Sequence, residues 1–209
     1  MSLGLFRKQA KSDYAGNVDG HALDQIFRKA RTHNGWRPIE VPDKLLEDAV
    51  DLAKMGPTSA NASPLRIVFV RSHEAKLRLK PALMPGNADK TMAAPVTAIT
   101  GYDTKFYELL PRLFPHADAK AWFVGKEAFA NYTAYRNGTL QVAYLIMALR
   151  AVGLDTGPMS GFDNAAVDAA FFPDGQVKSN VLVNIGYGDA DKLFRRSPRL
   201  AFDEIATIV

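Results

Sequence analysis

The sequence predicts an α+β fold in which helices surround a small mixed sheet, within a single domain over residues 20–209. Three observations lead to this class. Apolar runs of strand length alternate irregularly with segments of helical periodicity. The chain has 209 residues, of which 47% are hydrophobic and 23% charged, as in soluble globular proteins with one core. No internal repeat or low-complexity tract interrupts the pattern.

Apolar residues at helical spacing predict the helices in chain order. The second predicted helix, 43–54, is expected to be capped by Asp43 and to stop before the turn-rich segment 55–64. The helix at 132–152 has the strongest pattern, and its wide apolar stripe predicts burial on most sides. That stripe comprises Leu140, Ala143, Tyr144, Met147, Ala148 and Ala151. The predicted helices cover 20–32, 43–54, 72–80, 132–152 and 165–171.

Short buried strands are predicted at 66–70, 94–102 and 179–188, where β-branched residues are frequent. Residues 105–131 read as a mobile insertion or a helical excursion. The glycine-rich segment 153–163, "GLDTGPMSGFD", cannot continue a helix and is expected to be a loop. Residues 1–19 are expected to form a polar tail.

Several functional classes are excluded by composition and spacing. A net charge of +4 is too mild for a nucleic-acid binder, although it favours small anions. The chain has no cysteine, and its four histidines lack metal-ligand spacing, so thiol chemistry is excluded and a metal is not expected. Its longest apolar run, 142–149, is far shorter than the roughly 20 residues of a membrane span. With no secretory leader evident, we expect a cytoplasmic protein without a membrane partner.

Four polar loops remain as candidates for a site. They are 31–36 ("RTHNGW"), 56–61 ("GPTSAN"), 157–162 ("GPMSGF") and 195–199 ("RRSPR"). Each alone also has a structural interpretation, since Arg31 suits a helix C-terminus and the others suit turns or a solvated basic patch. The "GYGD" at 186–189 lacks the third glycine and the βαβ unit of a dinucleotide-binding fold, so no such mechanism is expected.

In order and spacing, the four loops resemble the nitroreductase family of FMN-dependent reductases. The family's P-S-x-x-N-x-x-P segment corresponds to Pro57–Pro64, and its G-x-x-x-x-P-x-x-G-F loop corresponds to Gly153–Phe162. Its late G-Y pair and following basic residues correspond to Gly186–Tyr187 and 196–199. The resemblance covers about residues 20–209, and within the family it is closest to the malonic semialdehyde reductases of pyrimidine degradation. It implies the nitroreductase fold and a homodimer, with FMN at the subunit interface and the central helix in the contact.

The resemblance also implies which residues hold FMN. Arg31 and Arg199, with Arg196 as an alternate, would bind the phosphate, because guanidinium groups suit phosphate better than ammonium groups do. The turn at Ser160 and Gly161 would place a backbone N–H against flavin N5, which carries the chemistry, so no side chain is assigned as catalytic. The remaining expected contacts to the cofactor are Thr32, His33, Asn34, Pro57, Thr58, Ser59, Asn61, Pro158 and Met159, with Asn87 as a weaker candidate that also reads as a turn residue.

One position departs from the family pattern. The family often has a lysine or arginine near the N1/O2 edge of the flavin, whereas this chain offers His33 and Asn34. A protonated His33 could supply that charge, and Asn34 could only donate a hydrogen bond. His33 alternatively reads as a loop histidine with a satisfied hydrogen bond.

The function implied is ping-pong reduction of a small carbonyl or nitro compound, with NADH or NADPH as cosubstrate. Malonic semialdehyde would be reduced to 3-hydroxypropionate by hydride transfer through flavin N5. No acidic side chain in the loops is an evident proton donor, so water could serve. Two alternatives remain, namely a broad nitro- or quinone reductase with the same flavin site and a non-enzymatic flavin-binding module.

Overall fold

The computed structural model describes residues 16–209, and at its centre is a four-stranded sheet with the order β1-β2-β4-β3. The strands are β1 (Leu65–Val70), β2 (Val96–Asp103), β3 (Asp155–Met159) and β4 (Val177–Gly186). The α+β class is confirmed, but the sheet is antiparallel rather than mixed, because all three strand pairings are antiparallel. Within residues 16–209, the single parallel pairing is an isolated bridge between Thr32 and Thr156.

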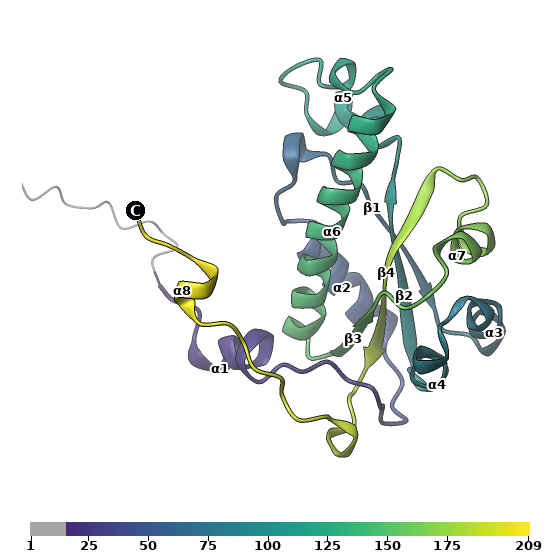
Figure 1. The fold of residues 1–209 in the computed structure, drawn as a ribbon, viewed down its shortest axis with the longest axis vertical. Coiled ribbons are helices and arrows are strands. Elements are labelled where there is room, and N and C mark those ends of the chain that lie inside the picture. Colours follow the sequence, from purple (N-terminus) through teal and green to yellow (C-terminus); the bar gives the residue numbers. More distant parts are fainter. Residues whose placement is uncertain (1–15) are drawn as a thin grey trace, which may run out of the picture.

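The helices cover both faces of this sheet (Figure 1). The long helix α6 packs with α2 against one face, where Leu145, Leu149 and Val183 are fully buried. On the other face, α3 and α7 enclose a second apolar cluster with Leu79, Val167 and Leu182. The helices are α1 (Gly20–Leu23), α2 (Asp43–Ala53), α3 (His73–Leu79), α4 (Pro85–Ala93), α5 (Leu110–Leu113), α6 (Glu127–Ala151), α7 (Asn164–Phe171) and α8 (Phe202–Ile205).

Several predicted elements need correction. Residues 155–159 of the expected loop form strand β3, and α4 was not predicted. The first helix changes to a π-helical turn at Asp24–Arg28 and ends well before residue 32. Pro42 rather than Asp43 is the N-cap residue of α2. Of the expected N-terminal tail, residues 1–15 lie outside the described residues.

The region 105–131 is a helical excursion with its own small core. It contains α5, two 3₁₀ turns at Phe106–Leu109 and Lys120–Trp122, and the first turn of α6. Phe106 and Phe123 meet edge to face with ring centroids 5.0 Å apart. Helix α6 therefore begins at Glu127, because this excursion packs on its N-terminal end.

Helix α6 is also less enclosed than its sequence pattern predicts. Leu140 is 41% exposed, and Phe129, Tyr132 and Tyr135 are each at least half exposed. The buried side of α6 instead includes polar residues, among them Asn137 and Gln141. The exposed side thus presents a row of large apolar groups that residues 16–209 do not cover.

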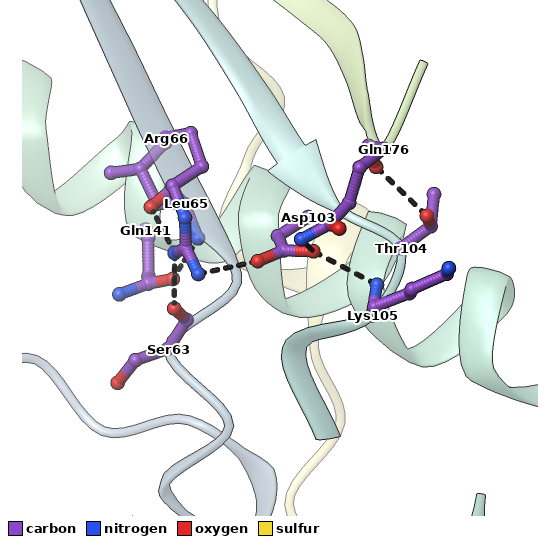
Figure 2. Close-up of polar contacts among 8 residues, drawn as sticks. All are labelled: Ser63, Leu65, Arg66, Asp103, Thr104, Lys105, Gln141 and Gln176. Atoms are coloured by element: carbon purple, nitrogen blue, oxygen red, sulfur yellow. Dashed lines mark hydrogen bonds and ion pairs between the residues drawn. The ribbon is translucent and has the colours of Figure 1, made fainter. Parts of the chain in front are cut away.

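A buried carboxylate fixes the corner where β2 ends (Figure 2). Asp103 is 3% exposed and accepts hydrogen bonds from Arg66 at 2.5 Å, Gln176 at 2.9 Å and the Lys105 N–H at 2.9 Å. Because every oxygen of a buried carboxylate needs a partner, this cluster ties β1, β2 and the chain entering β4 together.

The C-terminal segment leaves the sheet and runs beside α1 to a short helix, α8 (Figure 1). Several of its large apolar side chains are largely exposed, namely Phe194, Leu200, Phe202, Ile205, Ile208 and Val209. Among residues 16–209, no helix has the length and apolar character that crossing a membrane requires.

Candidate functional site

A cavity of about 370 Å³ lies between the segment after α1, the C-terminal end of α6 and residues 194–199. Five arginines line it, and none of them forms an ion pair within the part of the chain that the structure describes. They are Arg31, Arg150, Arg195, Arg196 and Arg199. Burial lowers the pKa of Arg150, against the opposing effect of Asp155. Such a concentration of unpaired guanidinium groups is suited to an anionic ligand.

Backbone carbonyls of distant segments position three of these arginines. Arg150 donates to the carbonyl of Ile26 at 3.2 Å. Arg31 donates to the carbonyl of Phe194 at 2.5 Å, and Arg196 donates to the carbonyls of Arg28 and Ala30 at 3.0 and 2.8 Å. Among the described residues, Arg199 donates only to the carbonyls of its neighbours Ser197 and Pro198. The three arginines predicted from the sequence are therefore brought together, and each guanidinium retains N–H donors for a ligand.

The segment with Arg31 and Thr32 is fixed against β3. Thr32 pairs with Thr156, and the His33 N–H donates to the Thr156 carbonyl at 3.0 Å. A Cβ at Gly157 would overlap the His33 carbonyl oxygen. Gly157 is thus required for close approach of two backbones rather than for contact with a ligand.

His33 points into the protein. It is 7% exposed, and its Nε2 lies 3.3 Å from Asp155 Oδ1, while the Gly188 N–H donates to Asp155 Oδ2 at 2.8 Å. Burial raises the pKa of Asp155, but the bonds from His33 and Gly188, together with the charges of His33 and Arg37, lower the pKa overall. A Cβ at Gly188 would overlap the imidazole. Of the two candidates for the flavin edge, Asn34 rather than His33 lines the arginine cavity.

A lysine that sequence reasoning missed lies beside Asn34. Lys90 on α4 donates to Asn34 Oδ1 at 3.4 Å. One turn earlier on the same helix, Asn87 donates to the Gly161 carbonyl at 2.7 Å. The spacing of Asn87 and Lys90 would have identified this pair only if α4 had been recognised as a helix.

The turn after β3 presents an unused backbone donor. The Gly161 carbonyl accepts from Asn87 and from the Met84 N–H, and no hydrogen bond from the Gly161 N–H is found within residues 16–209. Pro158 and Met159 lie within β3, and Ser160 is exposed. Gly161 does not have a positive φ, so a larger residue here would disturb the close contact with the Asn87 side chain and not the backbone conformation.

The turn at 57–61 stands apart from the other three loops. The Ser59 N–H donates to Asn137 Oδ1 at 2.8 Å, Asn61 donates to the Leu113 carbonyl at 2.8 Å, and the Pro57 carbonyl accepts from Tyr144. Thr58 accepts from the Ser63 N–H. In Figure 1 this turn lies beside the upper half of α6, whereas residues 31–34 pass below its lower end. No hydrogen bond joins it to the other loops within the described chain.

The arrangement offers a cluster of arginines for an anion, and beside it the amides of Asn34 and Asn87, the Gly161 N–H and the single cation Lys90. Residues 16–209 contain no group of three histidine, aspartate or glutamate side chains that could hold a metal ion. A ligand with a charged tail and a flat polar-edged ring matches this arrangement.

Comparisons with known proteins agree with this description. The sequence model described as "Nitroreductase family" matches residues 28–187. A protein of Burkholderia lata is 64% identical over 187 residues, which are 90% of this chain and 96% of that protein. One from Stenotrophomonas maltophilia is 61% identical over 191 residues, covering 91% and 97% of the two chains. Both carry the name "Putative NADH dehydrogenase/NAD(P)H nitroreductase".

Solved structures show the same fold at low sequence identity. A "putative nitroreductase in complex with FMN" from Exiguobacterium sibiricum has a TM-score of 0.79 at 18% identity, covering 92% of this chain and 98% of its own. A "Nitroreductase Family Protein" from Streptococcus pneumoniae has a TM-score of 0.77 at 22% identity, covering 88% and 98%.

Proposed function

This chain belongs to the nitroreductase family, and on that premise we propose that it is an FMN-dependent NAD(P)H oxidoreductase. The observation that carries the proposal is the cavity lined by five arginines without ion-pair partners in the described chain. The phosphate of FMN carries about −1.5 to −2 charges near neutral pH, which such a cavity would neutralise. Arg31, Arg196 and Arg199 would hold it, with Arg150 and Arg195 adding positive charge.

The residues around the β3 turn fit the ring of the flavin. The free N–H of Gly161 would face N5, and Asn87, Lys90 and Asn34 would meet the polar rim. Lys90 would supply the cation that the family often has near the N1/O2 edge, in place of His33, which is buried against Asp155. When bound, FMN would take a hydride from NADH or NADPH and pass it to an acceptor.

A homodimer is part of the proposal. The turn with Thr58, Ser59 and Asn61 does not reach the arginine cavity in its own chain, so a second copy would supply it to each site. The uncovered apolar side of α6 and the exposed C-terminal segment both support an interface between copies.

The acceptor distinguishes two versions of this function. The sequence resemblance implies malonic semialdehyde, reduced to 3-hydroxypropionate, whereas the names of the relatives at 61–64% identity favour nitro compounds. Turnover of malonic semialdehyde against a panel of nitroaromatics and quinones, with NADH and with NADPH, separates them. Reduction of bound flavin by dithionite but not by either nicotinamide would instead indicate a non-enzymatic flavin-binding module.

FMN binding to Arg199→Ala tests the assignment of the cavity, with Lys192→Ala as the control because Lys192 is exposed and does not line it. Losing a charge-assisted bond to phosphate costs about 1.5–3 kcal/mol, so Arg199→Ala should weaken FMN binding about tenfold to a hundredfold. Lys192→Ala should bind FMN like the wild type. Equal and small effects in the two variants would contradict the role of Arg199, and a wild-type chain that takes up no FMN would overturn the function.

A further inference from the structure

Lys76, on α3, is a buried cation outside the site described above. Lys76 is 4% exposed. Its ammonium donates to the carbonyl of Thr91 at 2.9 Å and to the carbonyl of Ala94. No carboxylate of residues 16–209 forms an ion pair with it. Burial lowers its pKa to about 8, because an enclosed charge loses its hydration.

The two carbonyls lie at the C-terminal end of α4. The last carbonyls of a helix have no partner within the helix, and the macrodipole favours a positive charge there. A second side chain contacts the same end, because the indole of Trp36 donates to the Lys90 carbonyl at 3.2 Å. The end of α4 is thus held by donors from two distant segments, and Lys76 supplies the charged one.

Helix α4 in turn carries two side chains that meet the candidate site. Asn87 reaches the Gly161 carbonyl, and Lys90 reaches Asn34. Both contacts depend on where α4 lies along its axis and how it is rotated. A shift of the helix end would move both side chains together, since an α-helix transmits displacement as a rigid unit.

The other polar contacts of α4 with the sheet are neutral. The Thr91 hydroxyl accepts from Asn184 at 3.2 Å and lies 3.5 Å from the sulfur of Met159. A neutral hydrogen bond is weaker than one from a charged group, so these contacts hold the helix less firmly than the ammonium does.

We propose that Lys76 is a positioning residue of the flavin site, which fixes the C-terminal end of α4 and thereby places Asn87 and Lys90 against the cofactor. The inference rests on the proposed function, because it assumes that FMN is the ligand. Lys76 does not touch FMN in this proposal. A lysine that only fills space in the core would leave FMN affinity unchanged when an apolar side chain of similar length replaces it.

The test is a double-mutant cycle on FMN affinity, measured by quenching of flavin fluorescence with the full chain. The variants are Lys76→Met, Asn87→Ala and the two combined; Lys76 and Asn87 form no direct hydrogen bond with each other. We expect each single change to weaken FMN binding about tenfold. The double variant should lose much less than the product of the two losses, because a displaced α4 already withdraws Asn87.

Leu79→Ala is the matched control, since Leu79 is fully buried on the same helix and its apolar side chain cannot bond the carbonyls at the end of α4. It should lower the melting temperature and leave FMN affinity at the wild-type value. Should Lys76→Met not give folded protein, Lys76→Gln carries the cycle, because a shorter, neutral amide replaces the charged donor to the two carbonyls, and weaker, non-additive binding is again expected.

Wild-type affinity in the Lys76 variant, or strictly multiplicative losses in the cycle, would overturn the positioning role. A wild-type chain that binds no FMN would instead overturn the proposed function, so the two failures are distinguishable.

Discussion

Replacing Gly161 with alanine tests the placement of the β3 turn against the flavin. A Cβ at this position would overlap the amide nitrogen of Asn87 and lie 3.3 Å from the sulfur of Met84. Asn87 must therefore move away, and its 2.7 Å hydrogen bond to the Gly161 carbonyl is lost. The one methyl group that alanine adds is therefore enough to push the turn and α4 apart.

The structure sets the size of the effect. A net hydrogen bond contributes about 0.5–1.5 kcal/mol, and crowding a packed contact costs roughly 1–3 kcal/mol. Because Ser160 is exposed and Gly161 is only half-buried, the turn can relax, so the unfolding free energy should fall by about 1–2 kcal/mol. FMN affinity should fall about tenfold or more, since Asn87 and the Gly161 N–H are displaced together.

Two measurements separate the effects on the site from those on the fold. Urea denaturation gives the unfolding free energy, and FMN titration under conditions where the variant is fully folded gives the affinity. Gly86→Ala is the control on α4, because a Cβ there meets nothing within 4 Å. It should bind FMN normally and be no less stable. If Gly161→Ala unfolds more easily yet binds FMN like the wild type, the turn is structural and the reasoning about N5 is wrong.

Two further predictions concern stability. The pKa of Lys76 is about 8 in the folded protein against 10.5 for a free lysine, so the unfolded chain binds more protons between these values. Wild-type stability relative to Lys76→Met should therefore rise with pH over that range, by up to about 3 kcal/mol in urea titrations, and a flat difference would refute the burial of a charged amine. Asp103→Ala removes the acceptor of Arg66 and Gln176 and should lower the unfolding free energy by about 2–3 kcal/mol without changing FMN affinity. An equal loss of FMN binding would show that this corner is coupled to the site.

The elements with clear periodicity were predictable from the sequence. β1, β2, β4, α2, α3 and α7 all lie within a few residues of their expected positions. In each, the pattern of apolar residues reports a face that is buried by its neighbours.

Strand β3 and helix α4 were not predicted because they contain proline, glycine and asparagine, which usually indicate turns. Pro158 is tolerated in β3 because that strand is at the edge of the sheet, and Gly157 makes room for the His33 carbonyl. Pro85 occupies the first turn of α4, where its missing N–H is not needed, so the following Gly86 and Asn87 are helical.

The candidate site was predictable in part. Arg31, Arg196 and Arg199 do converge on one cavity, as the resemblance implied. Lys90 was not predicted because its helix, α4, was not predicted. The burial of His33 depends on its contact with Asp155, which no local sequence pattern predicts. Contacts between distant segments depend on tertiary packing, which short sequence motifs do not predict.

The separation of the 57–61 turn from the arginine cavity makes complementation between damaged chains possible. If each flavin site takes the turn from one copy and the arginines from the other, an Arg199→Ala chain and an Asn61→Ala chain have defects in different halves of the site. A mixed dimer of the two then places both lesions in one site and leaves the other site intact. At an FMN concentration too low to load either variant alone, the two populations would regain turnover after mixing and subunit exchange, whereas sites built within one chain would stay unloaded in every combination.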